Sequence, residues 1–333
     1  MDSLTPTLAV AQNTAPSAVG FAGFWRRVGA FAIDCLILGC IGIALGSLLT
    51  EQLVALGPWG RLLGFFISLV YFGLLDSKLS GGQTPGKRLL KIRVQDAEGE
   101  ALSVGRSLLR FMPLGLAWFP NNAQFSASMY AQPWVSLISM AVFGLGLSLL
   151  YLLVFNRPSR QSVHDLLVGA FVVNSVEAQP RATLVACAPK QRHLAACASL
   201  LALAGLAPVL LSPWSAGSPF AQLMQVQQAL SAEPWLMTAS LNQGESFSVS
   251  NSSVDSGQKN RHFLSITAFC KDKDIDNPER AQRLARLALD KHQGAKALDV
   301  IQVSLVHGYD IGIASAWRVR HFARPPADWM APQ

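Results

Sequence analysis

Long apolar runs separated by short polar segments dominate the first two thirds of the chain. From Val28 to Leu49 the only charged residue is Asp34, and two arginines, Arg26 and Arg27, come immediately before this run. A helix needs about 20 apolar residues to cross the hydrocarbon core of a bilayer. The run therefore predicts a membrane-spanning helix with a basic anchor at its start and one acid within its first turns.

Four further apolar runs follow, so the pattern predicts about five membrane spans. A short loop at 50–58 separates the first span from the second, and a polar stretch at 121–132 separates the third from the fourth. The predicted spans cover residues 28–49, 59–75, 108–120, 133–155 and 194–212.

The third segment, 108–120, is short and leaves the topology open. If it crosses the membrane, the basic residues between 157 and 192 lie in the cytoplasm, and if it does not cross, they lie outside. Cytoplasmic loops carry an excess of Lys and Arg, so we expect this segment to cross, as a bent or re-entrant helix buried in protein. With a cytoplasmic N-terminus, the inner segments then carry every Lys and Arg of the membrane half except Arg61.

This topology places the chain in the inner (plasma) membrane as a multi-pass protein and divides it into five parts. The first 20 residues contain no Lys or Arg and many Ala, Ser, Thr and Pro, which is typical of a disordered segment. The predicted parts are a disordered cytoplasmic tail at 1–20, a transmembrane domain at 21–175, a cytoplasmic linker at 176–193, a transmembrane helix at 194–212 and an extracytoplasmic domain at 213–333.

The basic loop after the second span has a strand pattern. Charged and apolar residues alternate over Lys91–Val94, residues 96–100 are turn formers, and residues 101–104 can return as a second strand. This pattern predicts a small β-hairpin at the cytoplasmic surface.

The last third of the chain has the pattern of a small soluble α+β domain. Apolar residues recur at helical spacing over 219–231, and Asn277 followed by Pro278 predicts the start of a helix that stops near Gly294. Strands are expected at 247–249, 262–270, 298–306 and 311–320, the last two joined by a tight turn at 307–310. We expect an antiparallel sheet packed on a helix, with Pro325, Pro326 and Trp329 as a C-terminal packing strap. The fold class is thus an α-helical polytopic membrane protein with a C-terminal α+β domain.

Composition supports a membrane protein and excludes a nucleic-acid partner. Only 14% of the residues are charged and 51% are hydrophobic, although the formal net charge is +7; a typical soluble protein has roughly 25% charged residues. The five cysteines form no CxxC pair, so we expect neither a structural metal site nor a disulfide framework.

Three motifs of the membrane half together resemble the RDD family of prokaryotic integral membrane proteins. They are the Arg27–Asp34 stretch, the turn at 84–90 with the strand at 92–94, and the closing segment 160–169. The arginine and two aspartates that name the family match Arg27, Asp34 and Asp165. The resemblance covers about residues 20–175. The chain departs from the family at Ala170, where Thr is usual, and in the apparent insertion at 121–132; neither touches the naming residues.

The resemblance implies transport of an ion or small solute, or a transport accessory, because cation and proton exchange is the usual suggestion for this family. A buried carboxylate paired with Arg is what an ion path needs. An equally weighted interpretation is a polar network that only fixes helix packing. In either case the predicted network contains Arg27, Asp34 and Asp165, with Asp76 and, at a lower rank, His164.

Other chemistry is not expected. Residues 81–87 fit GxxxxGK, but the next residue is Arg88 rather than Ser or Thr, so a nucleotide loop is rejected in favour of a basic turn, Gly86-Lys87-Arg88, at the anionic inner surface. No catalytic constellation, metal site or cofactor is expected, and we do not expect an enzyme. The expected partners are the lipid bilayer, an ion or small solute, and, as the alternative function, a protein that the extracytoplasmic domain recruits to a membrane anchor.

Overall fold

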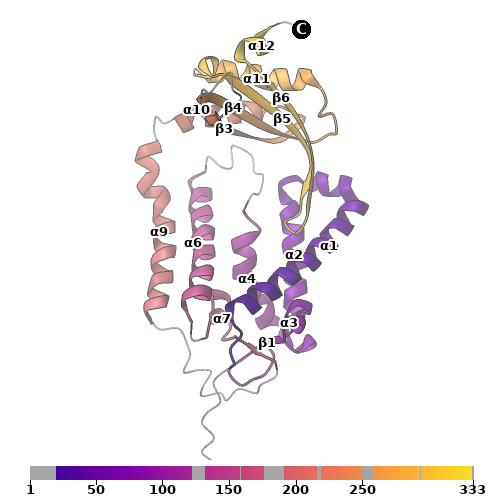
Figure 1. Cartoon of the computed structure of the whole chain (residues 1–333), viewed down its shortest axis with the longest axis vertical. Coiled ribbons are helices and arrows are strands. Elements are labelled where there is room, and N and C mark those ends of the chain that lie inside the picture. Colours follow the sequence, from indigo (N-terminus) through magenta and orange to yellow (C-terminus); the bar gives the residue numbers. More distant parts are fainter. Residues whose placement is uncertain are drawn as a thin grey trace, which may run out of the picture.

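The computed structural model describes residues 20–121, 132–157, 159–175, 191–215, 219–249, 258–292 and 294–331. Helices α1, α2, α4, α6 and α9 run side by side beneath a β-sheet domain, and smaller elements close the opposite end of the bundle (Figure 1). Among the described residues, two helical stretches, Phe24–Leu75 and Trp134–Phe155, are long and apolar enough to cross a membrane.

The first of these stretches joins α1 (Phe24–Leu56) and α2 (Gly60–Leu75) through the short 3₁₀ helix η1 (Gly57–Trp59). The predicted loop at 50–58 is therefore wrong, because helix continues to Leu56 with a kink at Leu49. Residues 50–56 contain no Gly or Pro, and their buried side chains Leu53 and Val54 pack on Tyr309 and Ile311. These two residues belong to the C-terminal domain, residues 219–331, which we call the outer domain because it lies outside the helix bundle. The helix ends only at Gly57, whose φ is 51°.

Helix α4 (Val104–Trp118) begins at the N-cap Ser103, earlier than the predicted start at 108, and contains Pro113. Its fifteen residues span only about 22 Å, yet they connect both ends of the bundle. Near its start Arg106 donates to the carbonyl of Val168 (2.6 Å). At its other end Trp118 Nε1 donates to the carbonyl of Gly312 (3.3 Å), in the outer domain.

Helices α6 (Pro133–Phe155) and α9 (Gln191–Ser215) form a second, closely packed pair. A Cβ on Gly144 would lie 2.7 Å from that of Ala204, so glycine permits the close approach. Both helices occur where apolar runs predicted them.

The end of the bundle that holds both the start of α1 and the end of α2 is closed by η2 (Lys78–Ser80), α3 (Pro85–Leu89), β1 (Ile92–Gln95), α7 (Val163–Leu167) and β2 (Phe171–Asn174). Strand β1 pairs antiparallel with β2, not with residues 101–104, so the predicted hairpin is wrong. Leu102 instead bridges Ser77 and is buried in a cluster with β1 and β2 residues. The turn at 96–100 is present, because Asp96 Oδ1 accepts from the N–H groups of residues 98 and 100.

The outer domain contains α10 (Pro219–Leu230), β3 (Leu236–Val249), β4 (Gln258–Cys270), α11 (Pro278–Lys291), η3 (Ala295–Ala297), β5 (Val300–Asp310), β6 (Ser315–Arg324) and α12 (Pro326–Met330). The strands lie in the order β3-β4-β5-β6. The expected antiparallel sheet is corrected at one pair, since β4 and β5 are parallel. Helix α11 connects them, and a connection of that length returns the chain in the same direction.

In this domain the sequence predicts the helix positions correctly but places the turn between the last two strands incorrectly. The side chain of Asn277 caps α11 by accepting from Glu279 N, and Trp329 is fully buried with its indole N–H on the carbonyls of Ile301 and Arg324. The predicted turn at 307–310 is wrong, because these residues extend β5 and the turn follows at 311–314.

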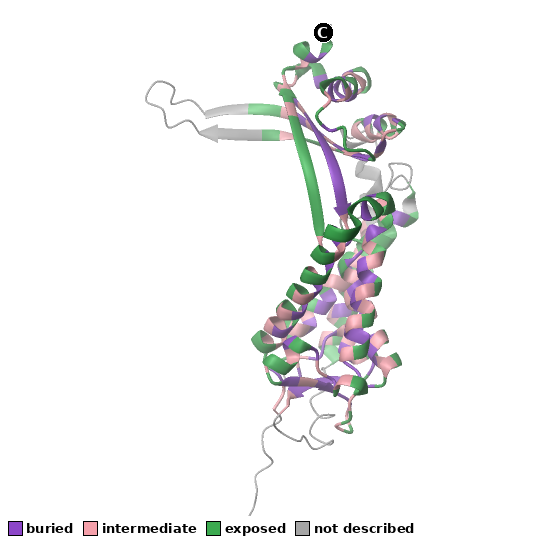
Figure 2. Ribbon diagram, turned by 90° about the vertical axis from the view of Figure 1, so that its right-hand side faces the viewer, coloured by how far each residue is buried: buried purple, intermediate pink, exposed green. Residues whose placement is uncertain are grey.

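The tip of the β5–β6 hairpin reaches helices α1 and α2 (Figure 2). A Cβ on Gly46 of α1 would overlap the Tyr309 hydroxyl, and one on Gly64 of α2 would overlap the main-chain oxygen of Ile311. Arg61 pairs with Asp310 at 2.5 Å. A second ion pair joins Glu51 of α1 to Lys273 at 2.6 Å. Among the described residues, the outer domain is thus seated on α1 and α2 by close packing and two ion pairs.

Candidate functional site

Five buried or nearly buried charged side chains, four from α1, α3, α4 and α7 and one from the residue that caps α2, form a chain of ion pairs at the end of the bundle closed by α3 and α7. Arg110 of α4 is its centre: one nitrogen lies 2.7 Å from an Asp76 oxygen and another lies 2.7 Å from an Asp165 oxygen. Lys87 also pairs with Asp76, and Arg27 pairs with Asp165 at 3.2 Å. The order Lys87–Asp76–Arg110–Asp165–Arg27 defines what we call the inner network.

The closing motif is folded around Arg27. Ser162 and Asp165 form a capping box that starts α7 and holds Asp165 toward α1 and α4. The Arg27 guanidinium also donates to the carbonyls of Arg160 (2.5 Å), Ser159 (3.2 Å) and Val172 (3.3 Å). One arginine therefore ties the first helix to the segment 159–172.

Asp34 is separate from the inner network, contrary to the single network that the sequence predicted. It is fully buried and accepts hydrogen bonds from the Tyr71 hydroxyl (2.9 Å), the Thr84 hydroxyl (2.5 Å) and the Gly86 N–H (2.9 Å). Within the described residues no Lys, Arg or His forms an ion pair with Asp34. Arg27, two turns earlier on α1, turns to Asp165 instead.

Glycine is required at the turn that covers Asp34. A Cβ on Gly86 would overlap the carbonyl oxygen of Ala30 and lie 3.0 Å from Asp34 Cγ. Thr84 N-caps α3, whose second residue is Gly86, so the same turn supplies two of the three donors.

The basic turn does not face the surface as a whole, which corrects that part of the prediction. Lys87 points inward and is about 11% exposed, whereas Arg88 lies outside and donates to Ser80 Oγ (2.7 Å). Burial lowers the pKa of Lys87 below its ordinary value, although the Asp76 carboxylate opposes that effect.

His164 touches the inner network from α7. Its Nε2 lies 3.4 Å from Asp165 Oδ1. Burial, assisted by the surrounding cations, lowers the pKa of His164 to about 4, so the ring is neutral at pH 7. Burial alone would raise the pKa of Asp165, but the charges around it, including Arg110 and Arg27, hold that pKa below its ordinary value.

The sequence analysis missed Arg110, Tyr71 and Thr84 as members of these sites. Arg110 lies inside the predicted span 108–120 that became α4, and a charge in such a place was the available signal. Tyr71 and Thr84 gave no comparable signal, because which hydroxyls meet Asp34 depends on how α2 and α3 pack on α1.

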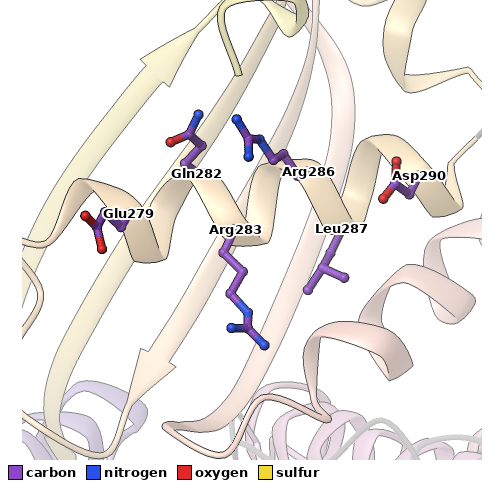
Figure 3. Close-up of a pocket in the computed structure, with 6 residues that line it drawn as sticks. All are labelled: Glu279, Gln282, Arg283, Arg286, Leu287 and Asp290. Atoms are coloured by element: carbon purple, nitrogen blue, oxygen red, sulfur yellow. The ribbon is translucent and has the colours of Figure 1, made fainter. Parts of the chain in front are cut away.

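The outer domain presents a shallow groove of about 320 Å³ along α11 (Figure 3). Its two arginines are already engaged: Arg283 pairs with Glu233 (2.7 Å), and Arg286 donates to the carbonyl of Trp329 (3.0 Å). Asp272 and Asp274, in the loop before α11, pair with Arg280. No cluster of three His, Cys, Asp or Glu side chains that could hold a metal occurs in the described part of the chain.

Comparisons with known proteins agree with the motifs. The model of the RDD family matches residues 21–169. Two uncharacterized proteins of Bacillus subtilis (strain 168) are similar: YckC is 28% identical over 153 residues, covering 45% of this chain and 83% of the relative. YxaI is 31% identical over 112 residues, covering 27% of this chain and 73% of the relative. No solved structure matches the chain. The chain is a membrane protein of the RDD family, and the match stops before the outer domain.

Proposed function

We propose that the membrane unit exchanges a cation or a proton across the bilayer and that Asp34 is the carboxylate that carries it. The observation behind this proposal is that Asp34 is fully buried and held by two hydroxyls and one N–H, with no cationic partner among the described residues. An ionisable group in the apolar part of a membrane protein is by default a candidate for an ion or proton path.

The inner network has a different role in this proposal. Asp76 lies between Lys87 and Arg110, and Asp165 lies between Arg110 and Arg27. A buried carboxylate that is paired with two basic side chains can give up these partners only at high cost. Breaking such a pair leaves a charged side chain buried without its partner. We therefore assign the inner network to holding α1, α4, α3 and α7 together, and only Asp34 to exchange.

The topology proposed with this function has five crossings of the inner (plasma) membrane, by α1, α2, α4, α6 and α9. The N-terminus lies in the cytoplasm. The contacts of α4 at both ends of the bundle favour its crossing, and a bilayer thinned at this helix or flanking residues can make up the missing length. The outer domain then lies outside the cytoplasm. An alkaline phosphatase fusion after residue 333 should be active and one at residue 160 inactive; the reverse pattern contradicts the orientation.

The exchange is tested with the full chain in proteoliposomes that contain a trapped pH-sensitive dye. An imposed Na⁺ or K⁺ gradient should drive a pH change in wild-type vesicles, and Asp34→Asn should abolish it. The Asn amide fits the site, because the Tyr71 and Thr84 hydroxyls can accept as well as donate. Asp96→Asn is the matched control, because Asp96 is a buried carboxylate in the turn that follows β1. This variant should keep the wild-type rate of pH change. A rate in Asp34→Asn equal to wild type would contradict the assignment.

A membrane-anchored binding protein is the second candidate, favoured by strand β6. This strand lies at the edge of the sheet, and its first seven residues are exposed (Figure 2). An extended segment can pair with such an edge, and the exposed Arg318 favours an acidic one. A photo-crosslinking residue at position 318 should capture a protein that the same residue at buried position 303 does not. Equal labelling from both positions, or none from 318, counts against this candidate.

A further inference from the structure

The surface groove at the same end of the bundle as the inner network carries three arginines that form no ion pair with a carboxylate of the described residues. It has a volume of about 680 Å³ and lies between the start of α1 and the end of α6. Arg26, Arg157 and Arg160 contribute to its wall.

These arginines differ from their neighbour Arg27 in having no acidic partner within the part of the chain that the structure describes. Arg26 donates to Asn174 Oδ1 (3.0 Å), and Arg160 donates to the carbonyl of Leu153 (3.3 Å). The side chain of Arg157 makes neither a hydrogen bond nor an ion pair with the described residues. Three like charges around one groove repel one another, and an anion placed among them relieves that repulsion.

The chemistry of the groove fits a phosphate group. Arginine presents a planar fork of donors that matches phosphate oxygens in two-point hydrogen bonds. The first turn of α1 adds backbone N–H groups that have no acceptor within the helix. The N-cap residue is Gly23, which has no side chain that could accept from them. The three arginines and the groove carry the assignment, and the helix terminus only adds to it.

Exposed apolar side chains beside the arginines indicate that the phosphate belongs to a lipid. Trp25 is 79% exposed and Val154 is 36% exposed, and both line the groove. Tryptophan collects at the level of the lipid head groups in membrane proteins, and basic pockets beside membrane helices on the cytoplasmic side bind anionic head groups.

We propose that this groove binds the head group of an anionic phospholipid, with Arg26, Arg157 and Arg160 on the phosphate and Trp25 against the acyl chains. The site does not depend on the exchange assigned to Asp34. It depends only on this end of the bundle lying at a membrane surface.

The test is a titration of the full chain in neutral detergent with dioctanoyl phosphatidylglycerol, dioctanoyl phosphatidylcholine and inorganic phosphate. We expect saturable binding of the phosphatidylglycerol alone. Arg26→Gln with Arg157→Gln should weaken it roughly tenfold or more, since two charge-assisted hydrogen bonds are lost. Arg192→Gln is the matched control, because it removes an exposed arginine at the same end of the bundle but outside the groove.

Three outcomes would overturn the proposal. Inorganic phosphate binding as tightly as the lipid would mean a site for a free anion, and equal loss in Arg192→Gln would mean unspecific charge attraction. No saturable binding of the phosphatidylglycerol to the folded chain would remove the site altogether. If the double variant does not fold, Arg157→Gln alone replaces it, because that side chain holds nothing in the described structure.

Discussion

Replacing Arg110 should lower the unfolding free energy of the bundle more than replacing an exposed residue at the same end. Its guanidinium lies 2.7 Å from both Asp76 and Asp165, and the three side chains are at most 8% exposed. Arg110→Gln leaves each carboxylate with only one cation, Lys87 or Arg27. Breaking a buried ion pair by removing one partner costs about 3–5 kcal/mol, so we expect a loss of unfolding free energy in that range.

Arg106→Gln provides the comparison on the same helix, one turn earlier. Arg106 is 41% exposed and pairs with Asp96 at 3.2 Å, and exposed pairs contribute only about 0–1 kcal/mol. Its bond to the Val168 carbonyl adds about 1 kcal/mol or somewhat more. The variant at position 110 should therefore melt several degrees below the variant at 106.

The assay is thermal unfolding in detergent, followed by tryptophan fluorescence, for the single variants Arg110→Gln, Arg106→Gln and Asp76→Asn and for Arg110→Gln combined with Asp76→Asn. If Arg110 acts through the buried carboxylates, the double variant loses less stability than the sum of Arg110→Gln and Asp76→Asn, because removing Asp76 removes part of the uncompensated charge. Equal melting temperatures for Arg110→Gln and Arg106→Gln would refute the reasoning.

Three further predictions concern acid stability and close packing. Because the folded chain holds the pKa of His164 near 4, and the unfolded chain near 6.5, stability should be fully present above pH 6.5 and should fall between pH 6.5 and 4, by on the order of 3 kcal/mol in total. In His164→Gln the melting temperature should change much less over that range, and an unchanged pH profile would contradict the prediction. Gly86→Ala should lower the yield of folded protein, because the new Cβ overlaps a carbonyl of α1, whereas Gly105→Ala, whose Cβ meets nothing within 4 Å, should not; size-exclusion profiles compare the two. Gly64→Ala should release the β5–β6 hairpin from α2, since its Cβ overlaps the Ile311 oxygen, and faster limited proteolysis of the outer domain would report it; no change in cleavage would contradict the seating.

The sequence allowed prediction of elements whose cause is local. Apolar runs long enough to span a bilayer became α1, α2, α6 and α9, and the Asn277-Pro278 signal gave the start of α11 within one residue. Trp329 was expected to fasten the C-terminus and does so with its indole buried. In each case a side chain and its near neighbours in the chain determine the outcome.

Features that depend on distant partners were missed or misplaced. Strand β1 pairs with β2, about 80 residues later in the chain. The residues around Val94 contain no local signal that identifies this pairing partner. The turn expected at 307–310 lies at 311–314, because Tyr309 and Ile311 extend the hairpin to pack on α1 and α2. Gly308 favours a turn when only its neighbours in the chain are considered. The contact of the hairpin with α1 and α2 could not be predicted from those neighbours.

The candidate site divides in the same way. The motif residues Arg27, Asp34 and Asp165 were identified from the sequence, and all lie buried or nearly buried at one end of the bundle. Their grouping was not predictable, since the sequence placed Arg27 and Asp34 in one stretch but could not say which side chains each would contact. Only the packing of α4 and α3 separates the paired network from the solitary Asp34.

Comparing Asp34→Glu with Asp34→Asn tests the proposed exchange most directly. Cation-driven pH change is measured in proteoliposomes that hold equal amounts of wild type and of each folded variant. If the carboxylate carries the exchanged ion, Asp34→Glu retains a measurable rate and Asp34→Asn has none. Equal rates in the two folded variants, whether high or absent, would contradict a carboxylate that carries the ion.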